Sequence, residues 1–333
     1  MIEAVVAGRV GVDLTPAAPR TTLAAADSFV RAVGGFGGNI ATGLARLGVE
    51  TALLSAVGDD GHGDHVRAFL AAEGVDVAGI DTCPGTRTQV AFVEVWPPDR
   101  FPVTFYRAAP APETQLTGTE LPKGLVEAAP GVILSGSLLA AEPARSTALR
   151  ILAERRGSRH RPEGSFTLLD LDWRPSFWDR PRDAPALLEE AAALSDVVIG
   201  SDEEFEGAHM RPMIGPRGGA APAGFGSGSG GGPAMIVLKH GPAGVSLVTR
   251  SGRRSIPGIR VDVVCGTGSG DALTAAFAAG LLRGLDPLVA LERGNAAGAI
   301  VAGRLMCSTA MPSPDEIDRL LAGGTAVPQA ALS

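Results

Sequence analysis

Short apolar runs alternate with amphipathic helical patterns along most of the chain, and this alternation constrains the fold more than any other feature. The run TALLSAV, residues 51–57, is followed by GHGDHVRAFLAAEG, in which Val66, Phe69 and Leu70 share one helical face and Gly74 marks the end. Further apolar runs are GVILSG, FTLLDLD, DVVIGS and AMIVLKHG. Runs that are apolar throughout are typical of strands covered on both faces. The sequence therefore predicts an α/β fold with a doubly wound, mostly parallel sheet flanked by helices.

Two stretches interrupt the alternation, at residues 13–33 and 87–107. The second contains TQVAFVEVWPPDRFPVTFYR, which is typical of two extended segments joined by a Pro-Pro-Asp turn. We expect these stretches to form a small β-sheet lid beside a core made of residues 1–12, 34–86 and 108–333. A plain edge hairpin without a lid function is the alternative.

Two polar stretches predict loops inside the core. Residues 207–233 have the sequence GAHMRPMIGPRGGAAPAGFGSGSGGGP, which offers too little apolar surface to offset the entropy of ordering it. We expect a flexible glycine-rich loop without chemistry. The basic stretch RRGSRHRPEGS, residues 155–165, predicts a shorter solvated loop.

Charge and cysteine content exclude several classes of function. The chain has 29 Lys and Arg against 36 Asp and Glu, a net charge of -7, whereas non-specific nucleic-acid binding needs a basic surface. No apolar run is long enough to cross a bilayer, and the first residues lack the apolar core of a secretion signal. Three scattered cysteines are too few for a disulfide framework or a zinc site. We therefore expect a cytoplasmic protein that binds neither nucleic acid nor a membrane.

The segment with the clearest chemistry is IRVDVVCGTGSGDALTAAFAAGLLRG, residues 259–284. We interpret it as an apolar strand, a glycine cluster and a helix that ends at Gly284. The glycines at 266, 268 and 270 permit backbone angles at which successive N–H groups converge at a helix N-terminus, where partial positive charge favours an anion. The lysine of a Walker loop is missing. The pattern indicates a site for a phosphate group.

Asp271 lies beside this predicted anion site. A carboxylate there can accept a proton close to a transferring phosphoryl group, or it can cap the helix, and the local sequence leaves both open. Two other classes of protein also stay open. A dinucleotide-binding oxidoreductase is one, although no ribose-binding acid follows about twenty residues on. A non-catalytic sugar or nucleotide sensor is the other.

Two motifs resemble those of a known family. GSGDAL is similar to the GAGDAF signature of ribokinase-like (PfkB) sugar kinases, and GGFGGNIATGLARLG, residues 34–48, is similar to the family's N-terminal signature. Together they bracket nearly the whole chain in the family's order. The resemblance implies a ribokinase-like fold and an ATP-dependent carbohydrate kinase.

Roles on the acceptor side follow from this resemblance. It implies that Asp271 is the general base and that an anion hole is made by the backbone of Gly268, Ser269 and Gly270. The residues that bind sugar hydroxyls would be Asp13, Gly35 and Asn39. Without the family, Asp13 could cap a turn and Asn39 could cap its helix.

Roles on the nucleotide side follow in the same way. The segment SDEEF, residues 201–205, resembles the family's Asn-x-x-Glu element, with Ser201 in place of the Asn and Glu204 acting on Mg²⁺ through water. The resemblance implies ATP and Mg²⁺ as cofactors and leaves a monovalent cation such as K⁺ open. The implied ATP-binding residues are Ser201, Lys239, Gly241, Gly244, Gly266 and Asn295. Otherwise residues 201–205 would only start a helix, the two glycines at 241 and 244 would form a plain turn, and Asn295 would lie on a helix surface.

Three segments narrow the choice of the sugar that accepts the phosphoryl group. RFPVTFYR, DLDWRPSFW and IVLKHGPAG resemble RFPLIFYR, DIDYRPVLW and IVLKRGP of the 5-dehydro-2-deoxygluconate kinases of inositol breakdown, and CSTAMPSPDEI resembles their C-terminal stretch. Arg107 and Arg174 would supply forked donors for a sugar-acid carboxylate. Asp172 favours this acceptor over 2-keto-3-deoxygluconate, whose kinases tend to carry Asn there.

Alternatives to this acceptor assignment stay open. A 2-keto-3-deoxygluconate kinase is one, and a fructokinase or ribokinase is another. Arg107 could be a surface strand residue, and Arg174 could pair with Asp170 or Asp172. The resemblance also implies a homodimer that forms through the β lid.

Overall fold

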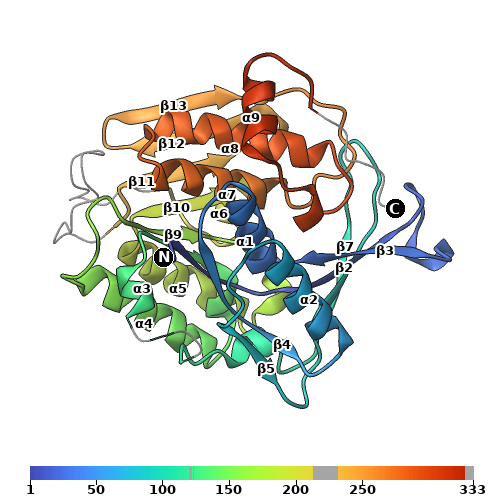
Figure 1. Cartoon of the computed structure of the whole chain (residues 1–333), viewed down its shortest axis with the longest axis horizontal. Helices are drawn as coiled ribbons and strands as arrows, with labels where there is room; N and C mark the ends of the chain where they lie inside the picture. The colour runs from blue at the N-terminus through green and yellow to red at the C-terminus, as the bar shows by residue number, and fades with distance from the viewer. Residues whose placement is uncertain (120–121, 123, 213–231, 327–333) are drawn as a thin grey trace.

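The computed structural model describes residues 1–119, 122, 124–212 and 232–326. Most of the predicted glycine-rich loop, at 213–231, lies outside the described residues. Within them, nine strands form one sheet in the order β13-β12-β11-β10-β9-β8-β1-β4-β5 (Figure 1). The seven strands from β5 to β11 run parallel, and β12 and β13 add an antiparallel hairpin at one edge. Their bounds are β1 Ala4–Ala7, β4 Thr51–Gly58, β5 Ile80–Cys83, β8 Gly131–Ser135, β9 Phe166–Asp170, β10 Val197–Ser201, β11 Met235–Lys239, β12 Gly244–Thr249 and β13 Gly252–Pro257.

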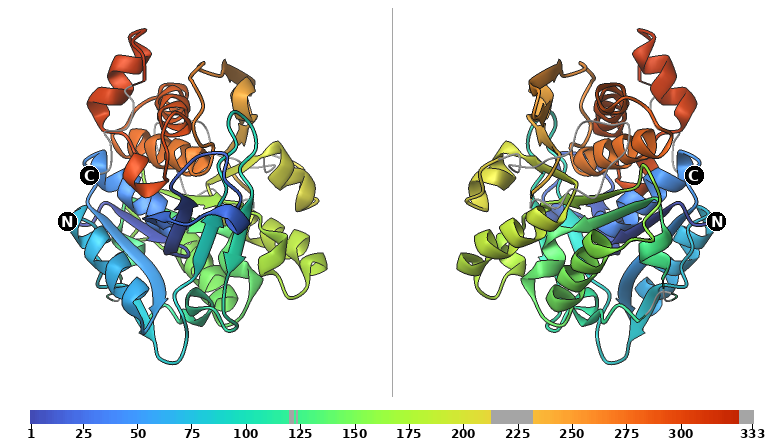
Figure 2. Two further views of the ribbon diagram at one scale, coloured as in Figure 1. Left: turned by 90° about the vertical axis from the view of Figure 1, so that its right-hand side faces the viewer. Right: turned by 90° about the vertical axis from the view of Figure 1, so that its left-hand side faces the viewer.

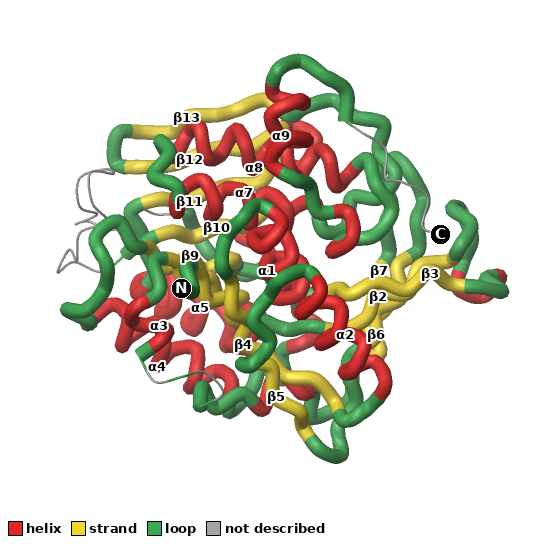
Figure 3. Tube along the Cα trace, viewed as in Figure 1, coloured by secondary structure: helices red, strands yellow, loops and turns green. Residues whose placement is uncertain are grey.

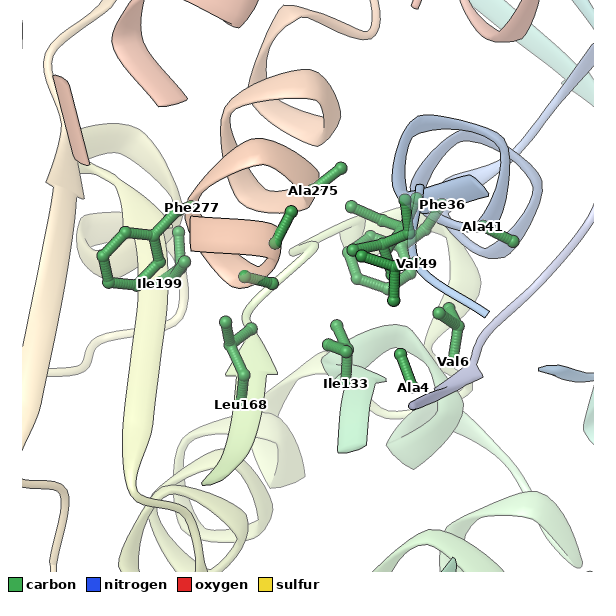
Figure 4. Close-up of a cluster of buried hydrophobic side chains, with 14 of the residues drawn as sticks. Ala4, Val6, Phe36, Ala41, Val49, Ile133, Leu168, Ile199, Ala275 and Phe277 are labelled. Carbon is green, nitrogen blue, oxygen red and sulfur yellow. The ribbon is translucent and has the colours of Figure 1, made fainter. Parts of the chain in front are cut away.

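Helices cover both faces of this sheet, as Figure 2 shows for α4 and α5 in green and α7 and α8 in orange. Side chains alternate across β1, so that Val6 packs with α1 and α7 while Val5 packs with α4 and α5. Figure 4 shows the first of these layers, with Phe36 and Ala275 above the strands. The helices are α1 Phe36–Arg46, α2 Gly61–Ala72, α3 Leu125–Ala128, α4 Ala144–Gly157, α5 Ala184–Leu194, α6 Asp202–Gly207, α7 Ser269–Leu282, α8 Pro287–Ala302 and α9 Pro314–Leu321. The predicted doubly wound α/β fold is confirmed.

A second sheet of four strands lies beside the main one, at the right in Figure 3. Its order is β3-β2-β6-β7, with bounds β2 Gly11–Pro16, β3 Phe29–Gly34, β6 Val90–Val93 and β7 Val103–Tyr106. We call it the small sheet. Its strands fall in or next to the two stretches that interrupt the alternation, so the predicted small β-sheet is present. The division of the chain into a core and a moving lid stays a prediction.

The parallel strands bring their carboxyl ends to one edge of the main sheet. Ser135 at the end of β8 is paired in register with Asp170 at the end of β9, and Ser201 at the end of β10 is paired with Lys239 at the end of β11. In open α/β sheets ligands bind at this edge. The edge therefore positions polar residues that lie far apart in the sequence.

Two sequence predictions are wrong. Residues 259–264 form no strand: β13 ends at Pro257, and the chain then crosses to α8, where the N–H groups of Val264 and Cys265 both bond to the carbonyl of Ala302. The segment 155–165 is not a plain solvated loop, because α4 continues to Gly157. Arg155 is fully buried and donates to the carbonyls of Val126, Glu127, Pro130 and Phe166.

Candidate active site

The glycine cluster forms a tight turn into α7. Gly268 is the N-cap residue at φ +84°, and a Cβ there would lie 2.9 Å from the Cβ of Cys307, so a side chain has neither the backbone angle nor the space. The hydroxyl of Ser269 donates to the carbonyl of Gly266 across 2.8 Å and tightens the turn. The N–H of Ser269 donates to the carbonyl of Gly266 across 3.3 Å. The first N–H groups of a helix have no partner within it, and those of Gly268, Ser269 and Gly270 are the ones predicted to form the anion hole.

Asp271 lies in the first turn of α7 but does not cap it, because Gly268 holds the cap position. Its Oδ2 instead accepts a hydrogen bond of 2.7 Å from Nδ2 of Asn39 on α1. Burial raises the pKa of Asp271 to about 6, helped by the charge of Asp172 and opposed by Asn39, Lys239 and Arg9. A carboxylate with such a pKa is ionised at neutral pH yet more basic than an exposed one.

Asn39 connects three elements. Its Oδ1 accepts a hydrogen bond of 2.7 Å from the hydroxyl of Ser308, while its Nδ2 donates to Asp271. It lies in the second turn of α1, where Gly35 is the N-cap residue, so the alternative of a helix cap does not apply. Its predicted contact with a sugar hydroxyl stays a prediction.

Lys239 carries a positive charge to the anion hole. Its ammonium group lies 3.3 Å from a carboxylate oxygen of Asp170 and 3.4 Å from one of Glu204, and a Cβ added at Gly270 would lie 3.4 Å from its Nζ. Burial raises the pKa of Asp170 to about 7 although Lys239 lowers it, and Thr274 of α7 donates to the same carboxylate across 2.8 Å. The network ties β9 and β11 to the helix that carries Asp271.

Ser201 and Glu204 start α6 as a reciprocal cap. The Ser201 hydroxyl accepts from the N–H of Glu204 at 3.1 Å, and Oε2 of Glu204 accepts from the N–H of Ser201 at 2.8 Å. Residues 201–204 therefore start a helix, as the alternative interpretation of this segment had it. The role of Glu204 in Mg²⁺ binding stays a prediction. In the described ranges no three His, Cys, Asp or Glu side chains come together to hold a metal alone.

Asp172 is held by two arginines and a hydroxyl. Nη1 of Arg9 lies 2.6 Å from its Oδ2, Nη2 of Arg174 lies 3.5 Å from its Oδ1, and Ser135 donates to Oδ2 across 2.7 Å. Burial acts to raise its pKa, but Arg9 and Arg174 bring that pKa below its usual value. The carboxylate is 4% exposed, so its oxygens serve the protein's own contacts. Arg174 does pair with Asp172, as the alternative had it.

Arg107 follows β7 and is not the free surface residue of the alternative. Its Nε and Nη2 donate to Oε1 of Glu113 across 2.9 and 2.6 Å, and its guanidinium lies 4.5 Å from the ring centroid of Phe177. The side chain is 16% exposed, whereas Arg174 is 40% exposed. Of the two arginines predicted to bind a carboxylate, Arg174 is the more accessible.

Asp13 and Gly35 lie at the junction with the small sheet. Asp13 is inside β2, not in a turn, and burial raises its pKa to about 6 although a hydrogen bond from Cys307 lowers it. A Cβ at Gly34 of the neighbouring strand β3 would lie 2.2 Å from this carboxyl group, so the position requires glycine. Gly35 has φ +82°, and a Cβ there would lie 2.8 Å from the carbonyl of Arg9.

The remaining nucleotide-side candidates lie around the β11–β12 turn. Gly241 and Gly244 have φ of +55° and +109°, and a Cβ at Gly244 would lie 2.1 Å from the carbonyl of Ile256. Asn295 is buried within α8 and donates to the carbonyl of Pro257 across 2.9 Å, so it is not a helix-surface residue. The structure joins it to the end of β13 and shows no direct contact with the anion hole among the described residues.

Sequence reasoning missed several residues of the site. The strongest signal was available for Arg9, a lone charge in the apolar run AVVAGRVGV, because a charge in such a run requires a buried partner. The others show no pattern of their own, since each depends on a partner more than 30 residues away or on a loop: Ser135, Phe177, Thr274 and Ser308. Asp170 was considered only as a partner of Arg174, whereas it lies beside Lys239.

Comparison with known proteins decides the family. The profile of the pfkB family carbohydrate kinases matches residues 1–314. The chain belongs to this family. As a pfkB carbohydrate kinase it is a phosphotransferase that acts on a sugar, which confirms the resemblance seen in the two motifs and sets aside the oxidoreductase alternative.

Individual relatives and solved structures agree with this family assignment. The chain is 31% identical over 324 residues to the 5-dehydro-2-deoxygluconokinase of Clostridium tetani, covering 96% of this chain and 93% of the relative. It is 30% identical over 322 residues to the enzyme of the same name from Shouchella clausii, covering 96% and 95%. An uncharacterized sugar kinase from Pyrococcus horikoshii, solved in complex with ATP, has a TM-score of 0.77 at 25% identity and covers 94% of this chain and 96% of its own.

A helix that spans a membrane needs about 20 consecutive, mostly apolar residues. None of the helices in the described part of the chain has the length and apolar character that crossing a bilayer requires.

Proposed function

We propose that this pfkB kinase transfers the γ-phosphoryl group of ATP to a hydroxyl of a sugar acid, and that the acid is 5-dehydro-2-deoxy-D-gluconate of inositol catabolism. The observation that carries the proposal is the position of Asp271 in the first turn of α7, held by Asn39 beside N–H groups that favour an anion. ATP as donor is supported by the ATP complex of the Pyrococcus horikoshii kinase.

Each group has a task in the transfer. Asp271 takes the proton of the acceptor hydroxyl, whose oxygen then attacks the γ-phosphorus while the bond to the β-phosphate oxygen breaks. The backbone N–H groups of Gly268, Ser269 and Gly270 stabilise the negative charge on the transferring group. Lys239, which lies over Gly270, adds a positive charge there. Asp13, Gly35 and Asn39 orient the acceptor, and Gly241, Gly244, Gly266 and Asn295 border the nucleotide.

Magnesium fits the carboxylates at this edge. Mg²⁺ usually keeps several waters and takes one or two carboxylates together with substrate phosphates, so it does not need a cage of three protein ligands. Glu204, with Asp170 beside it, would hold the ion through water, and Ser201 would orient Glu204 through the reciprocal cap. When bound, the ion would neutralise charge on the phosphates. A monovalent cation such as K⁺ would be a second cofactor beside Mg²⁺. Comparing kcat in potassium and in sodium buffers tests it.

The acceptor assignment is supported by two observations. The relatives at 31% and 30% identity are named 5-dehydro-2-deoxygluconokinases. Arg174 is 40% exposed at the edge where the acceptor would lie, and its nearest carboxylate oxygens, of Asp172 and Glu204, are 3.5 and 3.4 Å away. The one short hydrogen bond of Arg174 runs from Nη1 to the carbonyl of Trp173 across 2.8 Å, so the guanidinium retains donors for the carboxylate of a sugar acid.

The small sheet supports a homodimer. Phe29 and Tyr106 both pack edge-on against Phe92, with ring centroids 5.4 and 5.2 Å apart, and Tyr106 is 63% exposed. Exposed aromatic residues of this kind favour an interface. We propose that two copies meet through this face and that the enzyme acts in the cytoplasm.

The test is a panel of acceptors with ATP and Mg²⁺: 5-dehydro-2-deoxygluconate, 2-keto-3-deoxygluconate, fructose, ribose and adenosine. The proposal predicts the highest kcat/KM for the first. Preference for another acceptor would keep the kinase and replace the acceptor. No turnover with any of them, together with measurable sugar binding, would favour the sensor alternative.

A further inference from the structure

Arg9 is a buried arginine that the proposed chemistry leaves without a role. It follows β1 at the carboxyl edge of the sheet, and its side chain is 6% exposed. Nη1 and Nη2 donate to the two carboxylate oxygens of Asp172 across 2.6 and 3.3 Å, and the guanidinium lies 5.2 Å from the ring centroid of Phe177. Its Nε is buried with no hydrogen-bond partner within the described residues. A charge this deep is costly unless its contacts compensate it.

Arg9 and Arg174 share the carboxylate of Asp172 unequally. The buried Arg9 makes a forked contact with it, whereas Nη2 of the half-exposed Arg174 stays 3.5 Å from Oδ1 and its Nη1 lies 3.4 Å from Glu204. The forked arrangement is the stronger kind of arginine–carboxylate pair. Asp172 is therefore paired mainly with Arg9. Arg174 is fixed through Nη1, which donates to the carbonyl of Trp173 across 2.8 Å, while its contacts with the two carboxylates are long.

We propose that Arg9 is a positioning residue that satisfies Asp172 and thereby leaves Arg174 available for the carboxylate of the acceptor. The inference rests on the proposed sugar-acid acceptor and deepens it. Without Arg9, Asp172 would remain a buried carboxylate with Arg174 as its only cation within 4 Å in the described part of the chain. Because an uncompensated buried charge is strongly unfavourable, Arg174 would close onto Asp172 and its donors would be lost to the ligand.

The stacking on Phe177 supports this role. The guanidinium groups of Arg9 and Arg107 both lie against its ring, at 5.2 and 4.5 Å, and Arg107 is in turn fixed by Glu113. The ring and the Asp172 carboxylate thus hold Arg9 from two directions, which prevents it from approaching the ligand itself. Arg9 acts through its neighbours and is not a catalytic residue.

The experiment compares two acceptors: 5-dehydro-2-deoxygluconate and its analogue in which CH2OH replaces the carboxylate. The measured quantity is the ratio of their kcat/KM values, which isolates recognition of the carboxylate. Arg9→Gln is expected to lower this ratio about tenfold or more, through a higher KM for the acid, because one charge-assisted contact is lost. The KM for ATP is expected to stay unchanged.

Two further variants make the test specific. In an Arg174→Gln background, Arg9→Gln should lower the ratio no further, since both changes remove the same contact. The double variant Arg9→Gln/Asp172→Asn should recover most of the ratio, because it removes the carboxylate that would otherwise capture Arg174. A purely structural role of Arg9 predicts neither result.

The matched control is Arg283→Gln. Arg283 also pairs with a carboxylate, that of Glu3 at 2.6 Å, but at the opposite end of β1. This variant should leave the ratio unchanged. Arg9→Lys keeps the positive charge but cannot donate to both oxygens of Asp172, and it replaces Arg9→Gln if that variant does not fold. We expect Arg9→Lys to lower the kcat/KM ratio by a few fold.

The outcomes separate this inference from the proposed function. An unchanged ratio in Arg174→Gln would reject the arginine-bound sugar acid, and the role of Arg9 with it. A lowered ratio in Arg174→Gln with an unchanged ratio in both Arg9 variants would overturn the role of Arg9 alone.

Discussion

Asn39 donates a hydrogen bond across 2.7 Å to Oδ2 of Asp271, although 232 positions separate the two residues in the chain. The bond from the Ser308 hydroxyl to Oδ1 of Asn39 fixes the orientation of the amide, because that oxygen must be the acceptor. One oxygen of the Asp271 carboxylate is thus held in place, and the other is left to take the proton of an acceptor.

Replacing Asn39 should change the basicity of Asp271. The hydrogen bond favours the ionised carboxylate, so Asn39→Ala should raise the pKa of Asp271 and move the acidic limb of the kcat/KM profile upward by about half to one pH unit. The loss of activity should be greater at pH 6 than at pH 8. Ser308→Ala is the control, since it keeps the bond to Asp271 and should shift the limb less. Identical profiles for Asn39→Ala and the wild type would contradict the assignment.

The pH dependence of the wild type follows from the same carboxyl group. Burial raises the pKa of Asp271 to about 6, so the base becomes protonated as the pH falls through that value. We expect kcat/KM to decline as the pH falls below about 6 and to level off as the pH rises from there towards neutrality. A profile that stays flat down to pH 4.5 would show that no group with this pKa acts as the base.

Stability should change in the opposite sense from activity. The folded chain binds a proton at Asp271 more readily than the unfolded chain, so this group favours the folded state below about pH 4 and loses that contribution as the pH rises through 6. Asp271→Asn should therefore raise the free energy of unfolding at pH 7.5 by on the order of 1–3 kcal/mol. The gain should shrink toward pH 4. Denaturant titrations of both proteins at the two pH values measure it, and a destabilised variant at pH 7.5 would contradict the burial effect.

The glycine turn offers a matched pair of variants. Gly268 and Gly284 both have positive φ, at +84° and +71°, but only at Gly268 would a Cβ meet a neighbour, Cys307 at 2.9 Å, whereas Gly284 has open space. Gly284→Ala should cost about 1 kcal/mol of backbone strain and keep activity. Gly268→Ala should cost more and lower kcat at least tenfold, because the anion hole must shift. Equal effects in thermal melts and kinetics would reject the steric argument.

The proposed dimer interface on the small sheet can be tested by measuring the oligomeric state. Tyr106→Arg places a charge on its exposed aromatic face and should convert a dimer to a monomer in light scattering at micromolar concentration. Val289→Arg, at a residue 44% exposed on α8, is the control and should leave the dimer intact. A wild-type protein that is monomeric under these conditions would remove the proposed interface.

The parts predicted best from the sequence are those that local pattern determines. Uninterrupted apolar runs gave the strands that end at Ser135, Asp170, Ser201 and Lys239, since only covered strands tolerate such composition. The turn at Gly268 was predicted because glycine is required there by backbone angle and by space. These two features place the edge of the sheet and the anion hole.

Features that depend on distant partners were not predicted. Residues 259–264 alternate apolar and charged side chains up to Val263, but they lie beyond the last strand and cross to α8 instead of joining the sheet. Arg155, in a basic stretch that suggested solvent, is buried because backbone carbonyls from two segments, 126–130 and Phe166, accept its hydrogen bonds. The partners of Arg9 and Asn39 lie 163 and 232 positions away, a separation at which no local pattern operates.

The most direct test of the central claim is the turnover of Asp271→Asn. The variant keeps the shape of the side chain and an oxygen for Asn39 but cannot take a proton. We expect kcat to fall by about 10²–10⁴-fold or more while binding of the sugar acid, measured by calorimetry, stays within a few fold of the wild type. Turnover close to that of the wild type would show that Asp271 is not the base.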